Sequence, residues 1–229
     1  MTPDQALDAL RALAEEGRAA QMEAYHKMPR AYLGVPNPAI NELTKTWRQD
    51  LSVPQRVELA AALWPTDIFE ARLAAAKLLT QARLRPDDAA WALLQSWVLD
   101  FDSWAIADHV CMAGQKRLIA DPARLNDIAD WHRADHMWTR RAAFVITLPW
   151  TKQNHPKPAE LAVRERVLGW AETLTADHDW FIQKVLAWWL RDLSKHDAPR
   201  TRAFLEANGS AMKPWAVREA SRHLAGDSA

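Results

Sequence analysis

The feature that most constrains the fold of this chain is a short pattern that recurs along most of its length. Each copy begins with an aromatic residue, and in four of the five copies a basic residue follows three positions later. The aromatic residues that head the copies are spaced 35, 34, 43 and 34 residues apart, at Phe69, Trp104, Trp138, Phe181 and Trp215. A period of this length is typical of a unit of two α-helices, so we expect helical hairpins that stack on one another.

Helix geometry predicts which side of each helix carries the pattern. Residues three, four and seven positions after a head lie on the same side of a helix as the head, whereas the fifth position lies about 140° away. Four of the five copies have a small or apolar residue at that fifth position: Ala74, Ala143, Leu186 and Ala220. We therefore expect the fifth position to pack against a neighbouring helix, and the aromatic and basic residues to share a face that lines a concave groove.

Composition agrees with an all-α fold. The chain has only 6 glycines among 229 residues, and 49% of its residues are hydrophobic. Alanine and leucine, which favour helices, are abundant, and no segment alternates as a strand would. Residues 151–158 have the composition of a loop, and they account for the long interval of 43 residues between two heads.

The 13 tryptophans exceed ordinary usage, and most of them must be structural. Trp47 and Trp189 suit either a core or a surface position, while Trp104 and Trp188 are candidates for contact with a ligand. Six further tryptophans lie outside the recurring pattern, and we expect them to pack in the core or between the helices of a hairpin: Trp64, Trp91, Trp97, Trp131, Trp150 and Trp170.

Asp108 follows Trp104 by four residues, so the two side chains should share one helical face. An aspartate inside a helix with apolar neighbours is unusual and indicates either an ion pair or a chemical role. We expect Trp104, Asp108, Arg141 and Trp188 to converge in the groove. Two indoles and a carboxylate would suit a sugar on which positive charge develops, as in cleavage of an N-glycosidic bond.

Charge and cysteine content restrict partners and compartment. Net charge is zero, but residues 1–135 carry 15 Lys and Arg against 19 Asp and Glu, so the basic excess lies in residues 136–229. The single cysteine, Cys111, is expected to be buried, and no leader or membrane span is evident, so we expect a cytoplasmic protein. His132 and His136 lack further ligands at metal-binding spacing, so neither a metal nor a cofactor is expected.

Several motifs, taken in order, resemble the AlkD-like DNA glycosylases, the HEAT-like-repeat branch of the DNA alkylation repair enzymes. The resemblance covers nearly the whole chain and begins near Tyr25 and Lys27. The motifs that carry it are Trp104-Ala-Ile-Ala-Asp108, Trp138-Thr-Arg140-Arg141-Ala-Ala143, Phe181-Ile-Gln-Lys184-Val-Leu-Ala-Trp188 and Arg218-Glu-Ala220.

The resemblance implies a right-handed α-solenoid of HEAT-like hairpins, formed as a single domain over residues 1–229, with the last few residues disordered. It also implies a monomeric hydrolase that excises cationic N3- or N7-alkylated purines from duplex DNA. Asp108, Trp104, Trp188 and Arg141 would be catalytic. Contacts to DNA would come from Tyr25, Lys27, Arg140, Lys184, Arg191, Lys213, Arg218 and Arg222. The alternative is a non-catalytic repeat module that binds DNA or a protein partner.

Overall fold

The computed structural model describes residues 1–224, and within this range all regular secondary structure is helical. An isolated β-bridge joins Ala31 to Ile68. The chain divides into two compact units, Met1–Asp121 and Pro122–Ala229, which are described one at a time. The all-α fold predicted from the recurring pattern is confirmed. The single-domain boundary stays a prediction, and the expected disorder of the last few residues concerns positions outside the described range.

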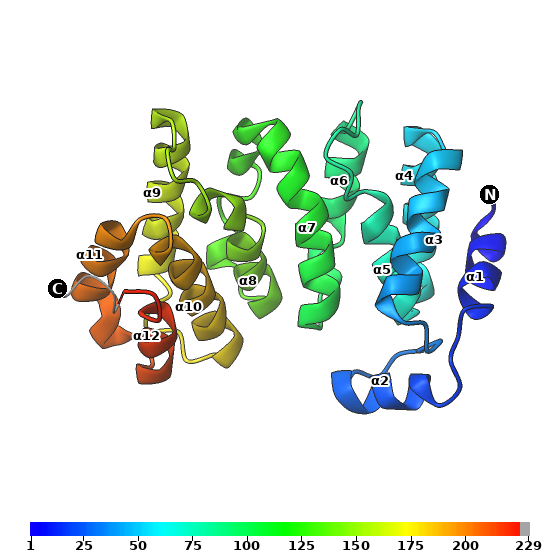
Figure 1. Ribbon diagram of the computed structural model, residues 1–229, viewed down its shortest axis with the longest axis horizontal. Helices are drawn as coiled ribbons and strands as arrows, with labels where there is room; N and C mark the ends of the chain where they lie inside the picture. Colours follow the sequence, from blue (N-terminus) through cyan, green and yellow to red (C-terminus); the bar gives the residue numbers. More distant parts are fainter. Residues whose placement is uncertain (225–229) are drawn as a thin grey trace. The chain divides into compact units, whose positions relative to one another are not determined.

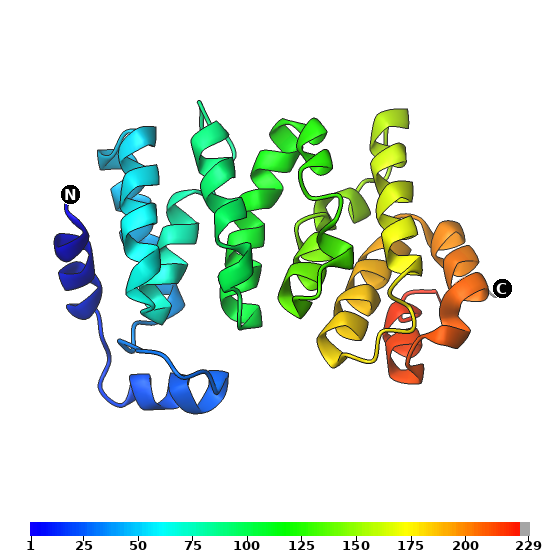
Figure 2. The ribbon, with the colours of Figure 1, turned by 180° about the vertical axis from the view of Figure 1, so that it is seen from behind.

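The first unit consists of two layers of helices, with its N-terminal segment along their edge (Figure 1). Helix α5 packs against α3 and α7, while α4 and α6 pack on one another and cover α5 and α7 from the other side (Figure 2). Helix α1 contacts α4 and α5. The bounds are α1 Pro3–Arg11, α2 Arg18–His26, α3 Asn37–Asp50, α4 Val53–Leu63, α5 Phe69–Leu78, α6 Asp88–Ser96 and α7 Trp104–Ala120, with 3-10 turns at Trp64–Thr66 and Val98–Asp100.

In the second unit, α10 is the central helix and packs against α8, α11 and α12. Helix α9 contacts the 3-10 turn that follows α8. The bounds are α8 Met137–Val145, α9 Pro158–Glu172, α10 Trp180–Ser194, α11 Ala198–Asn208 and α12 Pro214–Ala220, with 3-10 turns at Pro122–Asn126, Trp131–Arg133, Leu148–Thr151 and Gly209–Ala211.

The aromatic heads of the recurring pattern all lie in the first turn of a helix, in α5, α7, α8, α10 and α12. The residues at the fifth position after a head are buried where the pattern predicted helix packing, at Ala74, Ala143, Leu186 and Ala220. The period near 35 therefore marks one helical hairpin, as expected.

The tryptophans expected to be structural are buried, except for Trp131, which is half-buried. Trp64 and Trp97 stack with 4.2 Å between ring centroids. Trp47 and Trp189, which the sequence left open, are both core residues. Cys111 is buried, as predicted.

The residue that precedes α5 does not follow the usual preference of aspartate for helix caps. Asp67 has a left-handed φ of 52° and closes the 3-10 turn Trp64–Thr66, while Ile68 is the N-cap residue of α5. The Asp67 carboxylate pairs with Arg72, 3.0 Å away. Within residues 1–224, no helix is both long and apolar enough to cross a membrane.

Candidate functional site

Trp104 and Asp108 lie one turn apart at the start of α7. Trp104 is the first residue of the helix and is 38% exposed, whereas Asp108 is half-buried. Ile106 and Val110, on the opposite side of the helix, are buried in the core. The predicted common face of Trp104 and Asp108 is therefore confirmed, with an exposed indole and a half-buried aspartate on the same side of the helix.

The end of α2 brings two further aromatic rings to Trp104. The ring centroid of Tyr25 lies 6.3 Å from that of Trp104, and the centroid of His26 lies 5.9 Å away. His26 also packs on Phe69, the head of the preceding repeat, with 4.4 Å between centroids. Burial, followed by the charge of Arg30, lowers the pKa of His26. The imidazole packs between Phe69 and Trp104, and Tyr25, 68% exposed, is the accessible partner of Trp104.

A buried carboxylate fixes the segment that follows α2. Glu70, in the first turn of α5, accepts hydrogen bonds from the backbone N–H groups of Leu33, Gly34 and Val35 at 2.9, 2.7 and 3.1 Å. Gly34 has a φ of +84°, and a Cβ there would come within 2.9 Å of the Ala19 nitrogen. Glu70 was not singled out from the sequence, although a glutamate among the apolar residues of α5 could have been recognised as an anchor.

Arg30 ties the same segment to the starts of two repeat helices. Its buried guanidinium pairs with Asp102, just before α7, and lies 3.5 Å from Asp67, just before α5. Lys27, predicted to contact DNA, is exposed at the C-cap of α2 with a φ of 56°. The N-terminal segment is therefore held against the helix that carries Trp104 and Asp108.

In the second unit, Arg141 and Trp188 have structural contacts of their own. Arg141 is buried, and its guanidinium carbon lies 5.8 Å from the centre of the Trp138 ring. Trp188 is half-buried, and its Nε1 donates to a carboxylate oxygen of Asp192 at 3.2 Å. Lys195 pairs with the same carboxylate at 3.3 Å. The orientation of the Trp188 indole thus depends on a buried aspartate.

Two polar residues of the motifs around Trp138 and Phe181 form hydrogen bonds with the backbone of other segments. Arg140 donates to the carbonyls of Ala134 and Asp135 at 2.9 and 2.7 Å and pairs with Asp177 at 3.2 Å. Gln183 is fully buried. Its side-chain nitrogen donates to backbone carbonyls of the loop before α10, and its side-chain oxygen accepts from the backbone N–H of Lys213 at 2.9 Å. These contacts show that some of the motif residues stabilise the fold. The predicted role of Arg140 in binding DNA stays a prediction.

Exposed aromatic and basic side chains gather at the starts of α10 and α12. Trp180 is 51% exposed, its ring centroid lies 6.0 Å from that of Trp215, and Lys184 Nζ lies 4.4 Å from the centre of its ring. Sequence reasoning missed Trp180, because its neighbour Phe181 matched the repeat. Of the other predicted DNA contacts, Arg191 pairs with Glu219, Lys213 is half-buried, and Arg218 and Arg222 are exposed.

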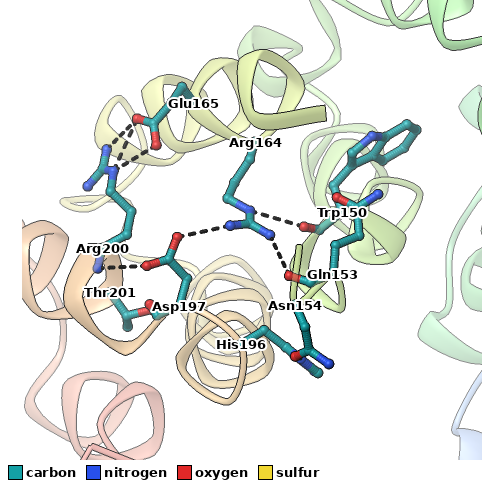
Figure 3. A network of polar contacts seen from close by, with 9 residues as sticks. All are labelled: Trp150, Gln153, Asn154, Arg164, Glu165, His196, Asp197, Arg200 and Thr201. Atoms are coloured by element: carbon teal, nitrogen blue, oxygen red, sulfur yellow. Dashed lines mark hydrogen bonds and ion pairs between the residues drawn. The ribbon is translucent and has the colours of Figure 1, made fainter. Parts of the chain in front are cut away.

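The insertion at residues 151–158 is anchored to the helices that follow it. The buried side chain of Arg164, in α9, donates to the carbonyls of Trp150 and Gln153 at 3.2 and 3.1 Å and pairs with Asp197 at 2.9 Å (Figure 3). Figure 3 also shows His196, whose Nδ1 lies 2.6 Å from the Asn154 side-chain oxygen. The extra residues are thus part of the framework of the second unit.

The four residues predicted to be catalytic come in pairs from the two units, Trp104 and Asp108 from the first and Arg141 and Trp188 from the second. Their convergence stays a prediction. Among residues 1–224, no group of three or more His, Cys, Asp or Glu side chains is arranged to hold a metal ion.

Comparison with known proteins identifies a family that matches the chain. The family described as DNA alkylation repair enzyme matches residues 6–224. A predicted DNA alkylation repair enzyme from Enterococcus faecalis has a similar structure, with 21% identity, a TM-score of 0.77, and 93% of this chain and 97% of that chain covered. AlkD2 from Streptococcus mutans is 16% identical, with a TM-score of 0.60 over 91% of this chain and 96% of that one. These likenesses confirm the helical-repeat fold. No curated protein matches the chain.

Proposed function

Because the chain belongs to the DNA alkylation repair enzyme family, we propose that it is a DNA glycosylase that removes cationic N3- or N7-alkylated purines from duplex DNA. The observation that carries this proposal is the accessible face at the start of α7, where Trp104, flanked by Tyr25, lies one turn before Asp108. An aromatic surface beside a carboxylate matches the chemistry of a sugar that becomes positively charged.

In the proposed reaction, the bond between the sugar C1′ and the purine nitrogen breaks, and its electron pair leaves with the base. Alkylation has already made the base cationic, so the base departs as a neutral purine and no acid is needed to protonate it. The sugar becomes an oxocarbenium-like ion, which the Asp108 carboxylate stabilises. A water molecule then adds to C1′ and gives a proton to the solvent, which leaves an abasic site.

Trp104 and Tyr25 would contact the deoxyribose through their ring faces and edges, which tolerate any base sequence. We further propose that Arg141 and Trp188 act on the same nucleotide, as the resemblance implies. The cationic groups near α10 and α12, Lys184, Arg218 and Arg222, would bind backbone phosphates. The neutral net charge of the whole chain is compatible with this, because the basic excess lies in its second half.

The competing function is a repeat module that binds DNA without catalysis. The exposed Trp180 and Lys184 would serve either function, because stacking and charge are sufficient for binding. A carboxylate one turn from an exposed indole favours the enzyme, since a carboxylate repels phosphate but stabilises a sugar cation.

The test is release of free base from duplex DNA that has been methylated in vitro, with the purified full-length protein. The proposal expects 7-methylguanine or 3-methyladenine in the soluble fraction and abasic sites in the DNA. Binding of the same DNA without release of either base would overturn the glycosylase and favour the binding module.

A further inference from the structure

A second polar site lies on the first unit, between α3, α5 and α7. It is a pocket of about 330 Å³, at the small end of the range for ligand sites. Its lining includes Asn41, Lys45 and Arg48 from α3, Lys77 from α5 and His109 from α7. A neighbouring pocket of similar volume shares Lys45 and Arg48. His109 directly follows Asp108, but neither the sequence motifs nor the proposed reaction uses this pocket.

The pocket carries positive charge that its own carboxylate does not balance. Glu42 is an acidic residue that lines the pocket, and its carboxylate pairs with Lys45 at 3.3 Å. The Lys77 ammonium donates instead to the neutral side-chain oxygen of Asn41 at 2.6 Å. Arg48 donates to the carbonyl of Lys77 at 2.7 Å. Arg48 and Lys77 are therefore held together by neutral groups, although their charges repel each other.

This arrangement costs free energy in the folded protein. Burial, and then the charge of Arg48, lower the pKa of Lys77 to about 8. Burial and the charge of Lys77 also lower the pKa of His109. The His109 Nδ1 lies 2.7 Å from the carbonyl of Ala105 and donates to it, so the Nε2 of the neutral ring is a hydrogen-bond acceptor. Clusters that destabilise the charged form of their members are typical of binding sites.

We propose that this pocket binds a phosphate group. A doubly charged oxyanion would accept from the Lys45, Arg48 and Lys77 side chains and would offset the repulsion between them. Because Glu42 already pairs with Lys45, a ligand carboxylate would leave one positive charge of the pocket unbalanced, whereas a doubly charged anion balances both. The phosphate could belong to a DNA backbone or be free in solution, and both sources present the same oxygens. Binding of phosphate does not require that the protein release a base.

The first experiment is calorimetric titration of the full-length protein with inorganic phosphate at low ionic strength. The wild type should bind phosphate saturably, Lys77→Met should weaken binding about tenfold or more, and Lys77→Arg should restore most of it. Arg11→Gln is the matched control, because it removes one positive charge from an exposed pair of the same unit, outside the pocket. It should change affinity less than twofold. Absence of saturable binding, or equal binding by Lys77→Met and wild type, would overturn the proposal.

The charge on Lys77 adds a pH test. Sulfate keeps its double charge throughout, so its affinity should fall between pH 7 and pH 9.5 as Lys77 loses its proton. The fall should be smaller in Lys77→Met, and identical pH profiles would count against the site. Glu42, Lys45, Arg48 and His109 face Lys77 and are present in both proteins.

Unmodified duplex DNA distinguishes the two sources of phosphate. If Lys77→Met loses both phosphate binding and part of its DNA affinity, with the slope of log K against log salt reduced by about 0.9, the pocket holds a backbone phosphate. If Lys77→Met loses phosphate binding but keeps the wild-type DNA affinity, the pocket holds free phosphate. Both results support the pocket, and both can be read whether or not the protein releases damaged bases.

Discussion

The ring of Tyr25 lies edge-on to the indole of Trp104, with 6.3 Å between the centroids and 80° between the ring planes. The contact joins the end of α2 to the start of α7. The N-terminal segment is therefore part of the candidate site, because the exposed Tyr25 lies beside Trp104, the residue that we propose contacts the deoxyribose.

Removal of the Tyr25 ring should affect activity more than stability. Tyr25→Ala should lower the free energy of unfolding by less than about 1 kcal/mol, because the ring is exposed and an aromatic pair contributes about 0.5–1.5 kcal/mol. Base release should slow about tenfold, equivalent to about 1.4 kcal/mol of lost transition-state stabilisation. Tyr25→Phe keeps the ring and should keep the rate. A full rate in Tyr25→Ala would exclude Tyr25 from the site.

Glu70 should be a major determinant of stability. Glu70→Gln removes the negative charge and replaces one of the two accepting oxygens by an NH2 group, which faces at least one of the three backbone N–H groups without accepting from it. We therefore expect a loss of about 3 kcal/mol in urea unfolding. Glu58→Gln, at an exposed position of α4, should stay within about 0.5 kcal/mol of the wild type. Similar effects of the two substitutions would show that the Glu70 contacts contribute little.

Two arginines near the insertion differ in burial and should differ in importance. Arg164→Met leaves Asp197 and two backbone carbonyls without their partner, and a loss of about 3–5 kcal/mol is expected. Arg200 pairs with Glu165 at the surface at 2.8 Å, and Arg200→Met should cost about 1 kcal/mol or less. Chemical denaturation measures both, and the reverse order would contradict the anchoring role of Arg164.

Lys77 should make stability depend on pH above neutrality. Its pKa is about 8 in the folded protein, below its ordinary value of 10.5, so the unfolded chain binds this proton more tightly. The lysine charge therefore destabilises the fold at pH 7, and this effect disappears as pH rises from about 8 toward 10.5.

Lys77→Met should accordingly melt at a higher temperature than the wild type at pH 7, with a difference that shrinks by pH 10. Because Lys77 is only partly buried, the gain should be well below the ~1.4 kcal/mol per pKa unit of a fully buried group. Melting curves followed by circular dichroism measure it. A difference that does not change with pH would show that Lys77 is not the group responsible.

The helices of the repeat could be predicted from the sequence, whereas the contacts between distant segments could not. The heads and small residues of the repeat are spaced by helix geometry, so α5, α7, α8, α10 and α12 could be predicted. The contact of Tyr25 with Trp104 and the anchoring by Glu70 link residues far apart in the chain, and such contacts leave no periodic signal. Asp67 shows the limit of residue preference, since a residue type that favours caps instead pairs with Arg72.

The measurement that tests the central claim most directly is single-turnover release of 7-methylguanine from methylated duplex DNA by wild type and Asp108→Asn. At saturating protein, the variant should release base about 100-fold or more slowly, because it lacks the charge that stabilises the sugar cation. Its affinity for the DNA should match that of the wild type, and Asp4→Asn, at an exposed site in α1, should release base at the wild-type rate. Equal rates for Asp108→Asn and wild type would contradict the account.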